Sequence, residues 1–141
     1  MSGKIHVGIS EDHLDIKKAY DFVDDPSHGA VNSFVGVVRK SNLGREVVAV
    51  SYDVFEPLAD KVLQQLCEKV RVSYDGKINI YLEHFRGKLG VGGISVVIAV
   101  STPHRAESFD VCRTLIEELK HLAPIWKLEY YLDGDSGWVK G

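Results

Sequence analysis

Proline at position 124 limits how the C-terminal third of this chain can fold, because proline cannot continue a helix. The residues before it place side chains three or four positions apart, as on the core-facing side of a helix: Phe109, Cys112, Leu115 or Ile116, and Leu119. After the proline, two sets of side chains alternate as on the two faces of a strand: Trp126, Leu128 and Tyr130 against Ile125, Lys127 and Glu129. The sequence therefore predicts a long helix, a turn at Pro124 and a strand.

Strand and helix patterns also alternate along the rest of the chain. Alternating or β-branched residues predict strands over residues 4–9, 28–39, 47–55 and 94–100, with another beginning at Ile78. Helices are expected over two further stretches: residues 15–23, and from Pro57 on, with Leu58, Val62, Leu66 and Val70 in one stripe. No repeat or linker divides the sequence, so residues 1–141 are expected to form one α+β domain. The order of elements favours a mixed, largely antiparallel sheet with helices over a regular βαβ array.

Composition excludes several classes of protein. With 45% hydrophobic and 26% charged residues, the chain has the composition of a globular protein. Its longest apolar run, residues 94–100, is too short to span a bilayer, and residues 1–4 carry no apolar signal segment, so we expect a cytoplasmic protein. The net charge of −3 gives no overall attraction for nucleic acid or an anionic membrane. Any anion site must therefore be a local concentration of positive charge.

Neither the cysteines nor the histidines form a recognisable metal or nucleophile motif. Cys67 and Cys112 lie in helical patterns and are expected to be reduced core residues, whereas a reactive thiolate would need exposure and a nearby cation. The histidines lack metal-ligand spacing, and no Ser-His-Asp order is visible. His28 is expected to be a local hydrogen-bonding residue. We expect no bound metal and no cofactor.

The glycine-rich segment 87–93 is not expected to bind phosphate. It matches neither of the common phosphate-loop patterns, and it lies between two predicted strands, where no helix start follows it. A flexible connection between the strands is the simpler interpretation.

A better candidate anion site lies at the start of the helix that ends before Pro124. Thr102 is expected to be the N-cap and Pro103 the first helical residue, which leaves His104 and Arg105 in the first turn. Unpaired backbone N–H groups and an arginine fork suit a phosphate or carboxylate. The alternative is that Arg105 only pairs with a nearby acid such as Glu107.

Lys120 and Lys127 flank the apolar turn around Pro124. Each lysine alone fits a solvated surface position, at a helix end and on a strand. Together they border an apolar wall that can partly desolvate an ammonium group, and nearby positive charges would then lower its pKa toward the range useful in catalysis. Arg39 and Arg105 could supply those charges if the fold brings them close.

Three ordered motifs resemble those of one known family. They are His104-Arg105, the run from Lys120 through Ala123-Pro124-Ile125-Trp126-Lys127-Leu128-Glu129, and Gly36-Val37-Val38-Arg39 followed by Asn42-Leu43-Gly44. This combination resembles the large, catalytic subunit family of molybdopterin synthase. The resemblance implies an α/β hammerhead-type fold and a sulfurtransferase. The reaction moves sulfur from the thiocarboxylated C-terminal Gly-Gly of a small ubiquitin-like partner to precursor Z, a cyclic pyranopterin monophosphate, and makes molybdopterin.

The resemblance also implies particular site residues. Those carried over as substrate-contacting are Val37, Val38, Arg39, His104, Arg105, Lys120, Lys127, Leu128 and Glu129. Lys120 is expected to be the principal catalytic lysine, which orients the thiocarboxylate and shuttles protons, with Lys127 assisting. Arg39, His104 and Arg105 would bind the phosphate and the pterin. Leu128 departs from the pattern, since relatives often have a basic residue there.

Family resemblance further implies a homodimer that carries one small subunit at each outer end, a heterotetramer. The valine-rich strands around residues 35–38 and 47–50 hold apolar surface that could be buried between protomers. The alternatives are a non-enzymatic α+β module that binds an anionic metabolite and a structural partner of another enzyme. Neither alternative needs both lysines, so convergence of Arg39, Arg105, Lys120 and Lys127 on one pocket would favour the enzyme.

Overall fold

The computed structural model describes residues 3–134 and 136–140, so the first two residues of the N-terminal segment discussed above lie outside it. Its elements follow in this order: β1 (Ile5–Ser10), α1 (Ile16–Val23), β2 (Ala30–Val37), β3 (Ser41–Asn42), β4 (Arg45–Val54), α2 (Glu56–Ser73), β5 (Asn79–Phe85), β6 (Gly87–Gly90), β7 (Ile94–Thr102), α3 (Arg105–Leu122), β8 (Ile125–Tyr131) and β9 (Ser136–Lys140). The α+β class is confirmed, and so are the helix, turn and strand predicted around Pro124.

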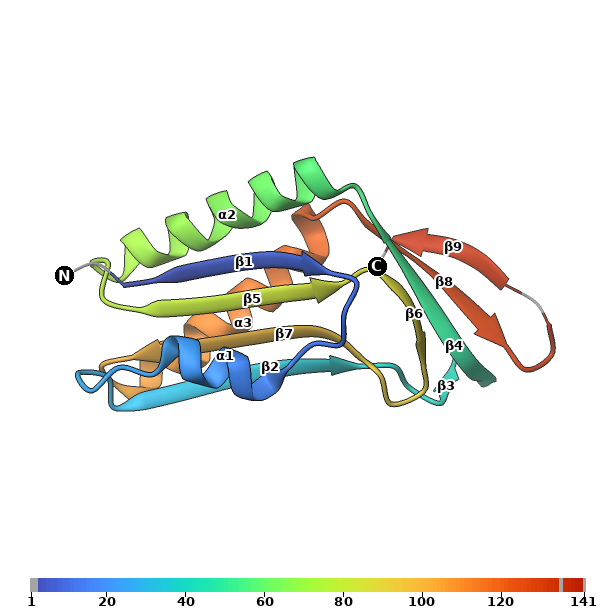
Figure 1. Ribbon diagram of the computed structural model, residues 1–141, viewed down its shortest axis with the longest axis horizontal. Coiled ribbons are helices and arrows are strands. Elements are labelled where there is room, and N and C mark those ends of the chain that lie inside the picture. Colours follow the sequence, from blue (N-terminus) through green and yellow to red (C-terminus); the bar gives the residue numbers. More distant parts are fainter. Residues whose placement is uncertain (1–2, 135, 141) are drawn as a thin grey trace.

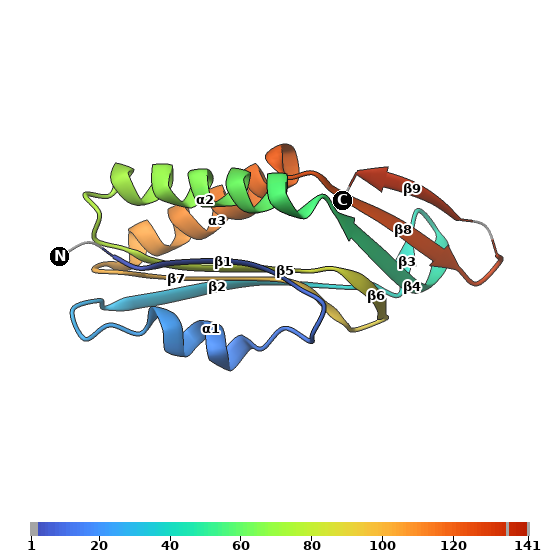
Figure 2. The same ribbon diagram turned by 45° about the horizontal axis from the view of Figure 1, so that its top comes forward.

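A four-stranded sheet in the order β1-β5-β7-β2 forms the middle layer of the larger part of the molecule. Helices α2 and α3 cover one face of this sheet and α1 covers the other (Figure 2). The β1–β5 pair is parallel and the other pairs are antiparallel. Strand β2 is an edge strand of this sheet, a position that matters for the function proposed below.

A second sheet, of five strands, extends from one end of the first (Figure 1). It has the order β3-β4-β8-β9, with β6 also paired to β4. The sequence predicted one sheet and a flexible connection at residues 87–93, but residues 87–90 form β6, which pairs with residues 49–52 of β4. Gly87 has a φ of 134°, which favours glycine, and it turns the chain out of β5 toward the second sheet. Leu89 is buried, which fixes this short strand against β4.

Apolar side chains fill both faces of the first sheet. One cluster lies under α2 and α3 and includes Leu63, Ile80, Ile98 and Leu115, all fully buried. A second cluster lies between α1, the other sheet face and the start of the second sheet. Within the described ranges, no helix is long and apolar enough to cross a membrane.

The two long helices bury slightly different faces from those predicted. Phe109 and Leu58 were expected to face the core, but they are 64% and 44% exposed. Helix α3 instead begins its buried face at Ser108, whose hydroxyl donates to the Arg105 carbonyl at 2.7 Å. Ser108 is small, and its hydroxyl is already hydrogen-bonded within the helix, so it can be buried at this position while Phe109 points to solvent.

Both cysteines are core residues, as predicted. Burial raises the pKa of the Cys67 thiol to about 12 and that of the Cys112 thiol to about 11. Both therefore remain protonated at neutral pH, and neither is suited to act as a sulfur nucleophile.

Candidate active site

Segments far apart in the sequence meet where the two sheets join. The end of β2, the β3–β4 hairpin and strand β8 enclose a cleft of about 70 Å³, which we call the lysine cleft. It is lined by Val37, Val38, Arg39, Ser41, Asn42, Val47, Val50, Tyr52, Lys127 and Glu129. Five of the nine predicted site residues therefore line one cleft, namely Val37, Val38, Arg39, Lys127 and Glu129.

Backbone hydrogen bonds hold the segment that carries Arg39. Val38 is buried, its N–H donates to the Gly93 carbonyl at 2.9 Å, and its carbonyl accepts from the Gly92 N–H at 2.9 Å. On the other side, the Lys40 carbonyl accepts from Val47 N–H at 2.7 Å. Arg39 is exposed between these anchored residues. Its backbone position is therefore fixed while its guanidinium group can reach a ligand.

Lys127 and Glu129 lie on the same face of β8 because side chains two residues apart share a face of a strand. Lys127 Nζ is 3.6 Å from Glu129 Oε1, and the side chain of Glu129 is only 8% exposed. Asn42 Nδ2 donates to the same Oε1 at 2.9 Å. A buried carboxylate therefore holds the Lys127 ammonium, and an amide from the neighbouring hairpin fixes that carboxylate.

The tight β3–β4 turn brings Asn42 to this position. Its two central residues, Leu43 and Gly44, have positive φ values of 52° and 75°. Positive φ at both central positions is the geometry of a two-residue hairpin turn whose twist matches the paired strands. Asn42 then pairs with Arg45 across the hairpin and directs its amide toward Glu129.

Lys120 lies in the last turn of α3 and is not among the residues that line the lysine cleft, but the charge of Lys127 acts on it. The residue keeps contact with solvent, but partial burial of its ammonium group lowers its pKa below the usual 10.5. The positive charge of Lys127 lowers that pKa further. A lysine with a depressed pKa gives up and recovers a proton more readily near neutral pH, as proton transfer requires.

A buried, neutral histidine lies near Lys120. Burial lowers the pKa of His84 to about 4, and the charge of Lys120 contributes to this shift. Its Nδ1 is 2.7 Å from the Phe85 carbonyl, and its ring contacts the edge of Tyr52 at 5.1 Å between centroids. Burial and the charge of Glu129 raise the pKa of Tyr52. Tyr52 therefore lines the lysine cleft as an uncharged ring, with the neutral His84 ring packed against it.

His104 and Arg105 lie at the other end of α3 and do not meet the lysines within one chain. Arg105 and Lys120 are fifteen residues apart on one helix, which corresponds to about 23 Å. The predicted cap was wrong: β7 continues through Thr102, His104 is the N-cap and the helix begins at Arg105. The Thr102 hydroxyl donates to the His104 carbonyl at 2.6 Å instead of capping the helix. Both residues of this cationic arm (His104 and Arg105) are exposed.

Other features lie outside the cleft. Leu128 points to the opposite face of β8, where it pairs with Ser51 and Trp138, and it is not among the residues that line the lysine cleft. A neighbouring hollow of about 370 Å³ shares Asn42, Lys127 and Glu129 with the cleft. A larger hollow of about 580 Å³ lies between α2 and α3 and contains none of the predicted site residues. The volume of a hollow therefore does not identify the candidate active site in this protein.

Comparison with known proteins identifies the family. The profile of the MoaE protein family matches residues 9–122. The chain belongs to the MoaE family. A molybdopterin synthase catalytic subunit of Synechococcus elongatus is 45% identical to this MoaE chain over 128 residues, which cover 91% of the chain and 78% of the relative.

Solved structures agree with the MoaE assignment. The structure of molybdopterin synthase from Staphylococcus aureus has a TM-score of 0.88 and 31% identity, covering 94% of this chain and 96% of the other. The complex of subunits 1 and 2 of molybdopterin-converting factor from Helicobacter pylori has a TM-score of 0.67 and 25% identity, covering 97% and 89%. These findings confirm the resemblance seen in the sequence. They identify this MoaE chain as a sulfur-transfer enzyme subunit of molybdenum cofactor biosynthesis.

Sequence reasoning missed three polar residues at this MoaE site. Asn42 belonged to a recognised motif but received no role, and Tyr52 and His84 were counted only as a strand residue and an unassigned histidine. The one available signal was the Asn-Leu-Gly turn, which favours a polar residue beside a tight hairpin. The contact of Asn42 with Glu129 joins residues 87 positions apart, so no local pattern could reveal it. Among residues 3–134 and 136–140, no group of His, Cys, Asp and Glu is arranged to hold a metal.

Proposed function

We propose that this protein transfers sulfur, in the cytoplasm, from the thiocarboxylated C-terminus of a small ubiquitin-like partner to precursor Z, forming molybdopterin. The observation that carries the proposal is a cleft lined by both Arg39 and Lys127, with Lys120 close enough for the charge of Lys127 to lower its pKa. Two lysines and an arginine suit a substrate with a phosphate and a partner that ends in an anion. Both cysteines are buried, so the transferred sulfur comes from outside the chain.

The two lysines have different surroundings, which supports different roles. Lys120 has no carboxylate partner among the contacts of the described residues, and its pKa is lowered, so we assign it the proton transfers and the orientation of the thiocarboxylate. Lys127 is held by Glu129, so we assign it to substrate binding and support of Lys120. Val37, Val38 and Arg39 border the cleft on the side of β2 and would contact the substrate there.

A second copy of the chain can bring the cationic arm to the lysine cleft. The start of β2 lies beside the arm, because Ala30 pairs with Thr102 and Gly29 N–H donates to Pro103 carbonyl at 3.1 Å. The end of β2 leads directly to Arg39. Eight residues of strand span about 23 Å, nearly the distance along α3 from Arg105 to Lys120.

Pairing two β2 edges around a twofold axis would run them antiparallel. The cationic arm of each copy would then lie beside the Val37–Arg39 segment of the other, completing a site that one chain leaves open. Three apolar side chains on β2 are exposed and available for such an interface: Val31, Phe34 and Val37. A homodimer in which each centre draws on both chains follows from this arrangement.

The apolar turn beside Lys120 supports a docking route for the small partner. Leu122 and Trp126, on either side of Pro124, are 50% and 48% exposed. An extended Gly-Gly tail has no side chains to clash with such a wall, and its terminal anion would meet Lys120. The complex from Helicobacter pylori contains two subunits. We propose one small subunit at each outer end of the homodimer, a heterotetramer.

A non-enzymatic module that binds an anionic metabolite is the less favoured alternative. Such a module would need the cationic arm but would have no use for a lysine whose pKa is lowered by partial burial and by a neighbouring lysine. The closeness of Lys120 and Lys127, from different elements, favours catalysis.

Single-turnover sulfur transfer to precursor Z, with a thiocarboxylated small partner, tests the proposal directly. Lys120→Ala is expected to lower the rate by about 10²–10⁴-fold, the usual effect of losing a general acid or base. Lys127→Ala is expected to act mainly on substrate affinity. Near-normal turnover in folded Lys120→Ala would refute the assignment of Lys120, and a wild-type chain without sulfur transfer would refute the proposed reaction.

A further inference from the structure

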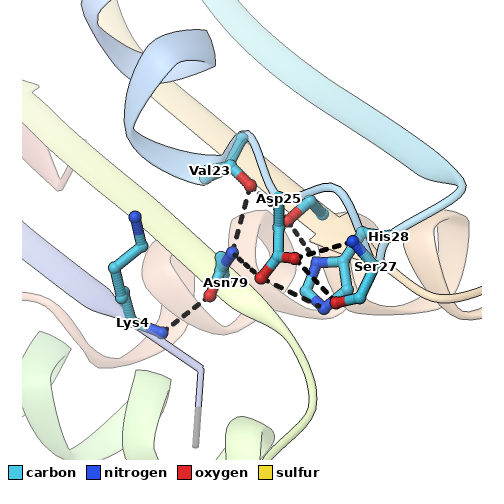
Figure 3. A network of polar contacts seen from close by, with 7 residues as sticks. Lys4, Val23, Asp25, Ser27, His28 and Asn79 are labelled. Carbon is cyan, nitrogen blue, oxygen red and sulfur yellow. Dashed lines mark hydrogen bonds and ion pairs between the residues drawn. The ribbon is translucent and has the colours of Figure 1, made fainter. Parts of the chain in front are cut away.

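A polar network, partly buried, joins the end of α1 to strand β5 and to the loop before β2 (Figure 3). It is centred on the α1–β2 loop (residues 24–29) and on the last residue of α1, Val23. The Val23 carbonyl accepts hydrogen bonds from Asn79 Nδ2 at 3.1 Å and from Ser101 Oγ at 2.6 Å. A helix leaves its last carbonyls without partners, so these two buried side chains complete the end of α1.

His28 connects this network to strand β7. The side chain of His28 is 6% exposed, and its Nδ1 is 2.7 Å from Ser101 Oγ. Because Ser101 uses its single hydroxyl proton on the Val23 carbonyl, the histidine must donate from Nδ1. His28 Nε2 then faces Asp25 Oδ2 at 3.9 Å, and Asp25 is itself fixed by the N–H and hydroxyl of Ser27.

These three side chains have the composition of a catalytic triad, but they cannot act as one. Ser101 is fully buried, and its hydroxyl proton is already donated to Val23. No substrate can reach the oxygen. The network instead has a structural role: its hydrogen bonds fix the position of the backbone around Ser101.

That backbone carries the cationic arm. Three consecutive residues before His104 are held in turn: Ser101 by His28, Thr102 by its bond to the His104 carbonyl, and Pro103 by Gly29 N–H at 3.1 Å. The same loop also sets the first residue of β2, since Ala30 follows Gly29 and pairs with Thr102. The α1–β2 loop thus fixes the edge strand and the cationic arm relative to each other.

We propose that His28 is a positioning residue that aims His104 and Arg105 at the lysine cleft of a second copy. The inference rests on the proposed function, which pairs two β2 edges and gives the cationic arm to the neighbouring site. The side chains of His104 and Arg105 are exposed, so their direction depends on the backbone beneath them. A shift at Ser101 or Pro103 would move the arm relative to β2 and weaken its hold on the phosphorylated substrate.

Steady-state kinetics of the complete complex with precursor Z test the inference. His28→Phe keeps a flat ring but removes the Nδ1 donor, and we expect KM to rise roughly 3- to 10-fold, the usual effect of losing one hydrogen bond, with kcat nearly unchanged. His28→Asn places an amide nitrogen near the Nδ1 position and should restore KM. Sedimentation should find both variants dimeric.

Asn79→Ser is the control for a general loss of stability. Asn79 binds the same Val23 carbonyl and holds β1 through Lys4 N–H at 2.7 Å. It also reaches Asp25 Oδ2 at 3.5 Å, but it makes no described contact with His104 or Arg105. Asn79→Ser should lower the melting temperature and leave KM at the wild-type value. An equal rise of KM in Asn79→Ser and His28→Phe would overturn the inference, because a general loss of stability would then explain both. An unchanged KM in folded His28→Phe would overturn it too.

Gly29→Ala perturbs the same segment without removing a buried polar group. A Cβ at position 29 would lie 2.9 Å from the Pro103 carbonyl oxygen, so the two backbones must move apart. KM should rise in Gly29→Ala as well, and this variant tests the positioning role if His28→Phe does not fold.

Arg105→Ala separates the positioning role of His28 from the proposed function. Raised KM in Arg105→Ala with normal KM in His28→Phe and Gly29→Ala refutes only the positioning role, whereas normal KM in Arg105→Ala refutes the cationic arm itself.

Discussion

Replacing Asn42 by aspartate would put a second carboxylate against Glu129. The amide nitrogen of Asn42 is now 2.9 Å from Glu129 Oε1, and the Glu129 side chain is 8% exposed. Two unit charges at that distance repel by about 1.4 kcal/mol in water and by about 6 kcal/mol at an effective dielectric constant of 20. The introduced carboxylate can relax and Lys127 offsets part of the repulsion, so we expect Asn42→Asp to cost about 2–3 kcal/mol at a pH of about 8.

This cost depends on pH in a defined direction. Repulsion raises the carboxyl pKa of the folded variant above its unfolded value near 4, by about two units for 2–3 kcal/mol. Below about pH 4 both states hold the proton and the cost vanishes, whereas above about pH 6 the cost is complete. Urea denaturation at pH 4.5 and pH 8, at one protein concentration, measures it. The control is Asn42→Ala, which loses the hydrogen bond without adding a charge.

Asn42→Asp should therefore be less stable than Asn42→Ala at pH 8 and should approach it at pH 4.5. Equal stability of the two variants at pH 8 would refute the described contact between positions 42 and 129. A difference that grows toward acid would refute the sign of the argument.

Three further outcomes follow from the site. Arg105→Ala should weaken binding of precursor Z by about 1.5–3 kcal/mol in calorimetric titration, as for a charge-assisted hydrogen bond, with an unchanged melting temperature; normal binding with early melting would make Arg105 structural. Burial lowers the pKa of Lys120 most, and the charge of Lys127 lowers it further; Lys127→Met removes the second cause, so the alkaline limb of the single-turnover pH profile should move to higher pH, whereas Lys17→Met on α1 should leave it in place. Phe34→Glu on the exposed edge strand should shift sedimentation from dimer to monomer and abolish sulfur transfer, and a dimeric Phe34→Glu would count against pairing through β2.

Local patterns predicted most of the elements of this fold. The helix expected over residues 15–23 is α1, and Asp15 is its N-cap, with its side chain accepting from Lys17 N–H at 2.9 Å. Pro124 ends α3 and opens β8 as expected. These features depend on neighbours within one or two turns of chain, which is what sequence periodicity reports.

Features that depend on tertiary contacts could not be predicted in the same way. Residues 87–90 looked like a loop because of their glycines, and only pairing with β4 makes them a strand. Thr102 looked like a helix cap, but pairing with Ala30 extends β7 through that position. At the site, the motifs led to Arg39, Lys120, Lys127 and Glu129 through resemblance. The roles of these residues stay predictions that the variants described above test.

The length of α3 gives the proposed dimer a genetic consequence. Because the helix separates Arg105 from Lys120 within one chain, each centre would take its lysines and Arg39 from one protomer and Arg105 from the other. A Lys120→Ala chain and an Arg105→Ala chain would each be defective alone. In a mixed dimer, both lesions would fall on one centre and the other centre would be intact. Co-expression of two inactive chains in equal amounts would then restore about a quarter of all centres, since about half of randomly formed dimers are mixed.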